Sequence, residues 1–215
     1  MKNFVNDFYT KAIQIITINL NQYNSSSTID SEIVCKSLEL ISIIIRILPD
    51  SISLKFEKSN IIEMIYQLID IHDVNINNYL FNLIGEFTNF PKSNLLEKSL
   101  EKIIFFLKLY LTSPENFPGL TGKSVNSDND KSYICAYNNC CWAIGSLSVN
   151  FGNQVAGAVE SCMNVLVKIL AFPKVNTFII YKFRLINPWP EIFQYALAAY
   201  VLPISLKSRN TLINS

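Results

Sequence analysis

Side chains able to carry out acid–base or nucleophilic chemistry are scarce in this chain of 215 residues. It has one histidine, His72, and none of its five cysteines forms a C-x-x-C pair. Gly122-Lys123-Ser124 resembles the end of a phosphate-binding loop, but Phe117 stands where that loop needs its first glycine. We therefore predict a chain that is not an enzyme and that uses no cofactor and no metal.

The side chains that could instead recognise a peptide lie on two helical patterns with the same layout. Each pattern, 76–89 and 134–149, has an apolar face for packing and a separate second face. The apolar faces are Ile76, Leu80, Leu83, Ile84 and Phe87 in one, and Ala136, Cys140, Ala143, Ile144 and Leu147 in the other. The second faces are Tyr79, Asn82, Glu86 and Asn89, and Asn139, Trp142 and Ser146. The shared Ile-Gly step indicates two copies of one helix.

Trp142 is open to two interpretations. Tryptophan in a helical protein is commonly a core residue. However, Asn82 occupies the corresponding position of the other copy, and the neighbours Asn138, Asn139 and Ser146 are polar. A core indole and an indole that faces a partner are both compatible with this pattern.

The elements that would position these residues are helices. We predict helices at 4–20, before a polar linker at 21–28, and at 30–48, where Pro49 ends the helix. The second would bury Val34, Leu38, Ile41, Ile45 and Leu48 and turn away Glu32, Cys35, Glu39, Ser42 and Arg46. A further helix would start at Asn153 and run to about Phe172, and the pattern is lost over 173–215.

A short repeat supports this order of elements. Residues 58–63 (KSNIIE) recur at 92–97 as KSNLLE, with Asn60 and Asn94 placed to cap a helix. Helix pairs recurring every 34 to 47 residues are typical of HEAT or armadillo solenoids. We predict an all-α superhelix over 1–172, with a polar insertion at 113–131 and a divergent tail at 173–215. Glu39 and Glu86 would then line one surface that could bind a basic and apolar peptide.

Composition limits the kind of partner. Half of the residues are hydrophobic, 16% are charged and the formal net charge is +1, which gives no attraction to nucleic acid. Residues 132–159 carry no charge, yet their asparagine and glutamine amides would need partners inside a bilayer. We predict a protein-binding chain that binds neither nucleic acid nor membrane.

Several motifs resemble the transportins, the karyopherin-β2 family of nuclear import receptors within the importin-β group. They are Asn138-Asn139-x-x-Trp142-Ala143-Ile144-Gly145, Leu83-Ile84-Gly85-Glu86-Phe87-Thr88, Ser37-Leu38-Glu39-Leu40-Ile41 and Lys58-Ser59-Asn60-Ile61-Ile62. The similarity covers about 8–172 and corresponds to the C-terminal third of a family of about twenty HEAT repeats. It implies a receptor that shuttles between cytoplasm and nucleus, contacts nucleoporins and carries cargo with Pro-Tyr-type nuclear localisation signals.

The resemblance also assigns roles to residues. Trp142 would take apolar cargo side chains beside Ile134, and Glu86 and Glu39 would face basic cargo residues where the family commonly has Asp. The repeats that bind Ran-GTP and the Pro-Tyr dipeptide are absent, and no helix pair is recognisable after Pro173. We expect a fragment or a truncated gene model whose apolar ends self-associate. The alternative is a HEAT scaffold unrelated to nuclear import.

Overall fold

The computed structural model describes residues 2–47, 60–88, 99–113, 128–157 and 160–161. These residues form α-helices and one short 3-10 helix, and they contain no strand. The all-α prediction is confirmed. Within the same residues, every helix is too short or too polar to cross a membrane. The chain divides into two compact units, Met1–Glu101 and Lys102–Ser215, and each is described by itself.

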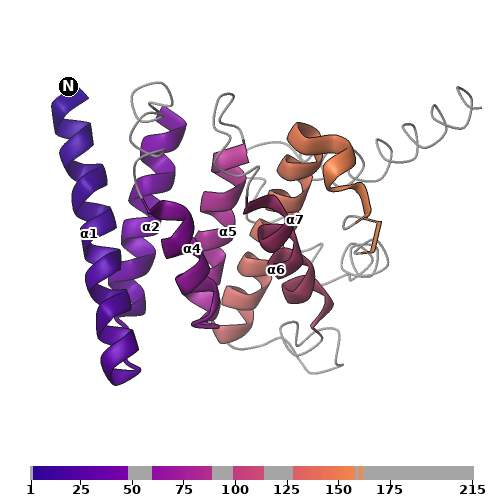
Figure 1. The fold of residues 1–215 in the computed structure, drawn as a ribbon. Coiled ribbons are helices and arrows are strands. Elements are labelled where there is room, and N and C mark those ends of the chain that lie inside the picture. Colours follow the sequence, from indigo (N-terminus) through magenta and orange to yellow (C-terminus); the bar gives the residue numbers. More distant parts are fainter. Residues whose placement is uncertain (1, 48–59, 89–98, 114–127, 158–159, 162–215) are drawn as a thin grey trace, which may run out of the picture. The chain divides into compact units, whose positions relative to one another are not determined.

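Among its described residues, the first unit contains two antiparallel helical hairpins (Figure 1). One hairpin is α1 (Lys2–Ser26) with α2 (Ser31–Ile47), and the other is α4 (Ile61–Ile69) with α5 (Val74–Thr88). Contacts join α1 to α4 and α2 to α5, as well as the two helices within each hairpin. The hairpins are therefore stacked, with α1 and α4 in one layer and α2 and α5 in the other.

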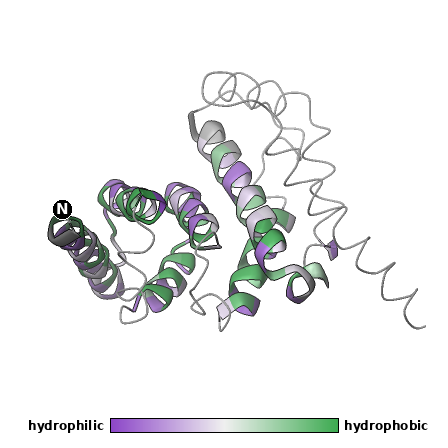
Figure 2. Cartoon of the chain, turned by 90° about the horizontal axis from the view of Figure 1, so that it is seen from above, coloured by the Kyte–Doolittle hydropathy of each residue, from purple (hydrophilic) through white to green (hydrophobic). Residues whose placement is uncertain are grey.

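The apolar periodicity accounts for this packing. All five residues predicted for the packing face of α5 are buried, as are Val34, Leu38, Ile41 and Ile45 of α2. Hydrophobic and hydrophilic residues occupy different sides of the helices (Figure 2). Cys35 and Ser42 are also buried, although the sequence placed them on the outward side of α2. That prediction was wrong because α2 packs on α5 through a second face as well.

The polar linker predicted at 21–28 is another correction, because α1 continues as far as Ser26. The hydroxyl groups of Ser25 and Ser26 donate to the carbonyl of Gln22, which accommodates serine within the last helical turn. Ser27, with φ 55°, then ends the helix. Sequence composition alone cannot distinguish such a polar last turn from a loop.

The sequence predicted the position of the residue before α4 correctly, but not its capping hydrogen bond. Asn60 directly precedes α4, but its side chain makes no capping hydrogen bond. Asp73 does cap a helix, α5, because its Oδ1 accepts hydrogen bonds from the backbone N–H groups of Asn75 (2.8 Å) and Ile76 (3.0 Å). The other predicted cap, Asn94, lies outside the described residues.

The second unit contains α7 (Asp128–Phe151) and η4 (Gly152–Gln154). It also contains α6 (Leu100–Thr112), except for the first two residues of that helix, which belong to the first unit. Residues 128–131, assigned to the polar insertion, are the first turn of α7. The helix predicted to start at Asn153 starts later, since a 3-10 turn occupies that position, Val155 lies in a turn, and the described residues after it, 156–157 and 160–161, are helical. The rest of the insertion, 114–127, and the tail at 173–215 lie outside the described residues.

Candidate functional site

The orientation of α7 is fixed by contacts with the end of α6. The hydroxyl of buried Tyr137 lies 3.2–3.3 Å from the carbonyl oxygens of Tyr110, Leu111 and Ser113, and it can donate its one proton to any of the three. One turn further along α7, Cys140 Sγ lies 3.5 Å from the carbonyl oxygen of Leu107. Burial raises the pKa of the Tyr137 phenol, which keeps the hydroxyl proton available for these contacts. Cys140 comes after Tyr137 in α7, but its partner Leu107 comes before the partners of Tyr137 in the sequence. The two helices are therefore antiparallel.

This anchoring decides which way Trp142 faces. The five residues predicted for the packing face of α7 are all buried. Trp142 lies on the other side of the helix from Ala136 and Leu147, and it is half-buried together with Cys135 and Asn138. Ser146, predicted to lie beside it on the second face, is buried, which corrects that assignment. Ile134 is within α7, but its side chain lies outside the described residues.

Glu86 of α5 is held by an ion pair between the two hairpins. Its Oε1 accepts a hydrogen bond of 2.8 Å from Nε of Arg46 on α2, and Nη2 of the same guanidinium also contacts this oxygen. The Glu86 side chain is only 7% exposed, whereas that of Arg46 is 61% exposed. Arg46 therefore covers the carboxylate, and a basic residue of a partner would have to compete with it.

Glu39 is also paired within the chain, but at the surface. Nζ of Lys36 donates to its Oε2 at 3.1 Å, and the two side chains are 66% and 42% exposed. The hydrogen bond from Lys36 to Glu39, together with the charge of that carboxylate, raises the pKa of the lysine. Surface pairs of this kind exchange readily with solvent and with other ions. Glu39 is thus the more accessible of the two carboxylates.

Asp73 joins the start of α5 to the start of α2. Besides capping α5, it accepts a hydrogen bond from Oγ of Ser31 through Oδ2 at 2.8 Å. Burial, and then the charge of Asp73, raises the pKa of the Cys35 thiol to about 12. Cys35 is therefore a neutral thiol packed in the core. No group of three or more potential metal ligands occurs among the residues that the structure describes.

The predicted site residues fall in both units. Glu39 and Glu86 lie in the layer formed by α2 and α5, while Trp142 and Ile134 belong to α7. Sequence reasoning did not find the two counter-ions. The spacing of Lys36 and Glu39, three residues apart in a helix, is a signal that could have revealed one pair. Arg46 and Glu86 are 40 residues apart, and only the stacking of the hairpins brings them together.

Comparison with known proteins gives one partial similarity. Over 60 residues the chain is 32% identical to transportin-1 of Oryza sativa subsp. japonica. The match covers 28% of this chain and 7% of the length of that protein. No family model and no solved structure matches the chain. The similarity supports a karyopherin-like helical relationship over this segment.

Proposed function

We propose that this chain is a cargo-binding segment of a transportin-like nuclear import receptor. Its stacked hairpins would belong to a HEAT solenoid, and the face of α7 that carries Trp142 would bind an apolar part of a Pro-Tyr-type nuclear localisation signal. The partial similarity to a transportin supports this proposal. The half-buried indole at a fixed position on α7 is the observation that carries it.

A half-buried indole on an anchored helix is suited to peptide binding. It presents a rigid apolar surface that loses little conformational entropy when a ligand covers it, and aromatic residues often dominate binding energies for that reason. Because the Tyr137 contacts fix the rotation of α7, the indole needs little rearrangement before binding. The proposed role is binding alone, without catalysis, in a protein that moves between cytoplasm and nucleus.

The carboxylates would contribute less than the indole. Lys36 is already paired with Glu39, and Arg46 with Glu86. The binding free energy from a basic cargo residue is therefore only the difference between the new ion pair and the internal one that it replaces. This internal pairing favours the second candidate, a helical scaffold that binds an apolar partner unrelated to nuclear import. The two candidates differ in whether basic residues of the ligand matter.

A fluorescence-anisotropy titration with a labelled Pro-Tyr-type signal peptide tests the proposal. Trp142→Ala should weaken binding about tenfold or more, because a central aromatic side chain contributes on the order of 1–3 kcal/mol. Phe105→Ala is the matched control, since Phe105 is an aromatic residue on α6 that is 64% exposed, and it should leave binding unchanged. Circular dichroism confirms that both variants remain folded.

The peptide also separates the two candidates. If replacing its basic residues by glutamine weakens binding and removes the dependence on salt, the import proposal stands. Binding that depends on Trp142 but not on the basic residues would favour the scaffold. Equal affinities of the wild type and Trp142→Ala would exclude this face of α7 in either case.

A further inference from the structure

The first helix carries an apolar stripe that the rest of its unit leaves exposed. Phe4, Phe8, Ile15 and Ile18 follow the spacing i, i+4, i+11, i+14 and lie within roughly a quarter of a turn of one another. Their exposed fractions are 65%, 40%, 38% and 64%. The rings of Phe4 and Phe8 pack edge to face, with centroids 4.5 Å apart. This stripe is separate from the face of α1 that packs on α2 and α4.

The second helix has a stripe with the same spacing. It comprises Ile33, Ser37, Leu40, Ile44 and Ile47, of which only the two ends are exposed, Ile33 at 46% and Ile47 at 66%, while Ser37 and Ile44 are buried and Leu40 is half-buried. The side of α2 that packs on α5 is marked by Arg46, which binds Glu86, and by Cys35 beside Asp73. The stripe of α2 lies on the opposite side, away from α5.

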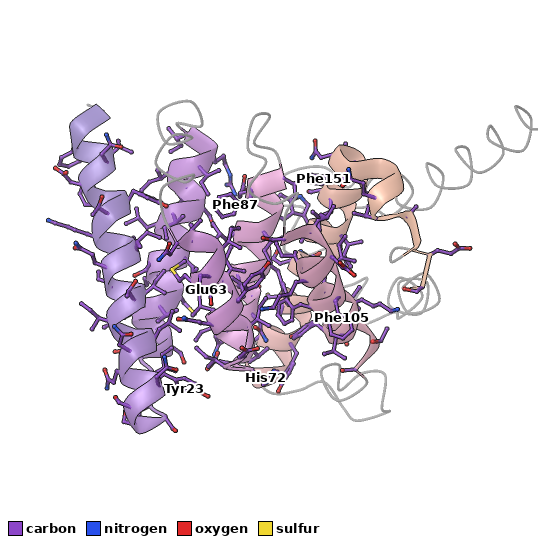
Figure 3. The ribbon with its side chains drawn as sticks, in the orientation of Figure 1. Tyr23, Glu63, His72, Phe87, Phe105 and Phe151 are labelled. Carbon is purple, nitrogen blue, oxygen red and sulfur yellow. The ribbon has the colours of Figure 1, made fainter. Side chains whose placement is uncertain are left out.

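Both stripes face the same way. In α1 the apolar stripe borders the packed face on one side. A polar face, which includes Asp7, Thr10 and Thr17, borders the packed face on the other side. Because α1 and α2 are antiparallel right-handed helices, the apolar flank of α1 and the stripe of α2 fall on one side of the hairpin, away from α4 and α5. Side chains of α1 project from this edge of the unit (Figure 3). We call Phe4, Phe8, Ile15, Ile18, Ile33 and Ile47 the end face.

We propose that the end face binds the end face of a second copy of this chain. At about 200 Å² for each fully exposed large side chain, the six exposed fractions correspond to roughly 600 Å² of apolar surface per copy. Two copies would bury roughly 1,200 Å², which reaches the size of a stable protein interface. The contact would also continue the packing already present in the unit, where one hairpin stacks on the next through both of its helices.

The charge on the stripe selects one arrangement of the two copies. Lys11 is exposed in the middle of the α1 stripe. Pairing α1 with α1 of the second copy in antiparallel fashion would place two Lys11 side chains together, which is unfavourable. Pairing α1 with α2 of the second copy instead places Lys11 beside Leu40 and Ile18 beside Ile33. A two-fold axis parallel to the helices produces this contact twice.

Sedimentation equilibrium of the full chain tests the interface. The wild type should have a mass of twice 24.5 kDa at micromolar concentration. Ile18→Glu should raise the dimer Kd by at least about thirtyfold, because it places an unpaired charge where Ile18 packs on Ile33 of the second copy. The matched control is Leu109→Glu, at an exposed position (51%) on α6, which should leave the Kd unchanged. A wild type that remains monomeric at about 100 μM, or a control as disruptive as Ile18→Glu, would overturn the proposal.

A charge-pair rescue tests the arrangement and the identity of the partner. Ile18→Glu and Ile33→Lys should each weaken the homodimer. An equimolar mixture should recover a heterodimer, with a Kd at least about tenfold lower than that of either variant alone. Both positions are exposed, so neither substitution should unfold the chain, and circular dichroism verifies this. A mixture that associates no more tightly than its components would overturn the pairing of α1 with α2.

Discussion

The layer formed by α2 and α5 differs from the outward face of α7 in how its functional groups are satisfied. In the first, Glu86 and Glu39 are each bound by a cation of the same chain. On α7, hydrogen bonds hold the buried side of the helix, and the indole of Trp142 is left half-buried on the other side. A polar face on a helix can therefore serve internal packing, and an acidic residue on it is not by itself a ligand site.

Replacement of Arg46, the counter-ion of buried Glu86, should have the largest effect on stability. Replacement by Met removes the donor to a carboxylate that is 7% exposed, so we expect a loss of about 2 kcal/mol in the free energy of unfolding. Lys36→Met, the matched control at the exposed pair, should cost less than about 0.5 kcal/mol. Urea unfolding followed by circular dichroism measures both.

A second substitution identifies the cause of that loss. Because Arg46→Met leaves Glu86 buried without its counter-ion, adding Glu86→Gln should recover part of the stability. Equal losses for Arg46→Met and Lys36→Met would show that burial of Glu86 does not matter, and the contrast between the two ion pairs would disappear.

A second prediction concerns alkaline pH. The pKa of Cys35 is about 12 in the folded chain and 9.0 as a free thiol, so above pH 9 the unfolded state loses this proton while the folded state keeps it. The stability that the neutral thiol contributes is present below pH 9 and is lost between pH 9 and about 12. Burial also raises the pKa of Tyr110 and Tyr137, so the second unit responds in the same direction.

The unfolding free energy measured at intervals from pH 8 to 11 checks this. Cys35→Ala should make the decline shallower than in the wild type, and the slope that remains should come from the buried tyrosines. Thiol labelling sharpens the comparison, since half-buried Cys135 and Cys141 on α7 should react faster than Cys35. If Cys35 were labelled as fast as Cys135 and Cys141, its side chain would not be buried on the side of α2 that packs on α5.

The smallest effects concern two chain reversals. His72, in the turn before α5, has φ 58°, so His72→Gly should stabilise the protein by about 0.5–1 kcal/mol. Gly152, after α7, has φ 44° and open space around the position of a Cβ atom, so Gly152→Ala should destabilise by about 1 kcal/mol through the backbone alone. Thermal unfolding measures both, and changes of the same sign would contradict the assigned turn geometry.

The sequence determined the helices and their first packing face. Apolar residues spaced at 3.6 per turn identified the buried stripes of α2, α5 and α7, because this spacing is a local property of each helix. It could not show that Asn21 to Ser26 continue α1, since serine and asparagine occur in both last helical turns and loops. Periodicity singled out Trp142, Glu86 and Glu39, resemblance added Ile134 and the cargo roles, and those binding roles remain predictions.

The tertiary structure alone decided the second packing faces and the ion pairs. Cys35, Ser42 and Ser146 are buried because a stacked helix contacts neighbours on two sides, whereas a periodic pattern reveals only the more apolar side. Arg46 meets Glu86 because two hairpins pack side by side, and no local spacing encodes a contact across 40 residues. Whether a carboxylate faces a partner or a cation of its own chain depends on such distant neighbours.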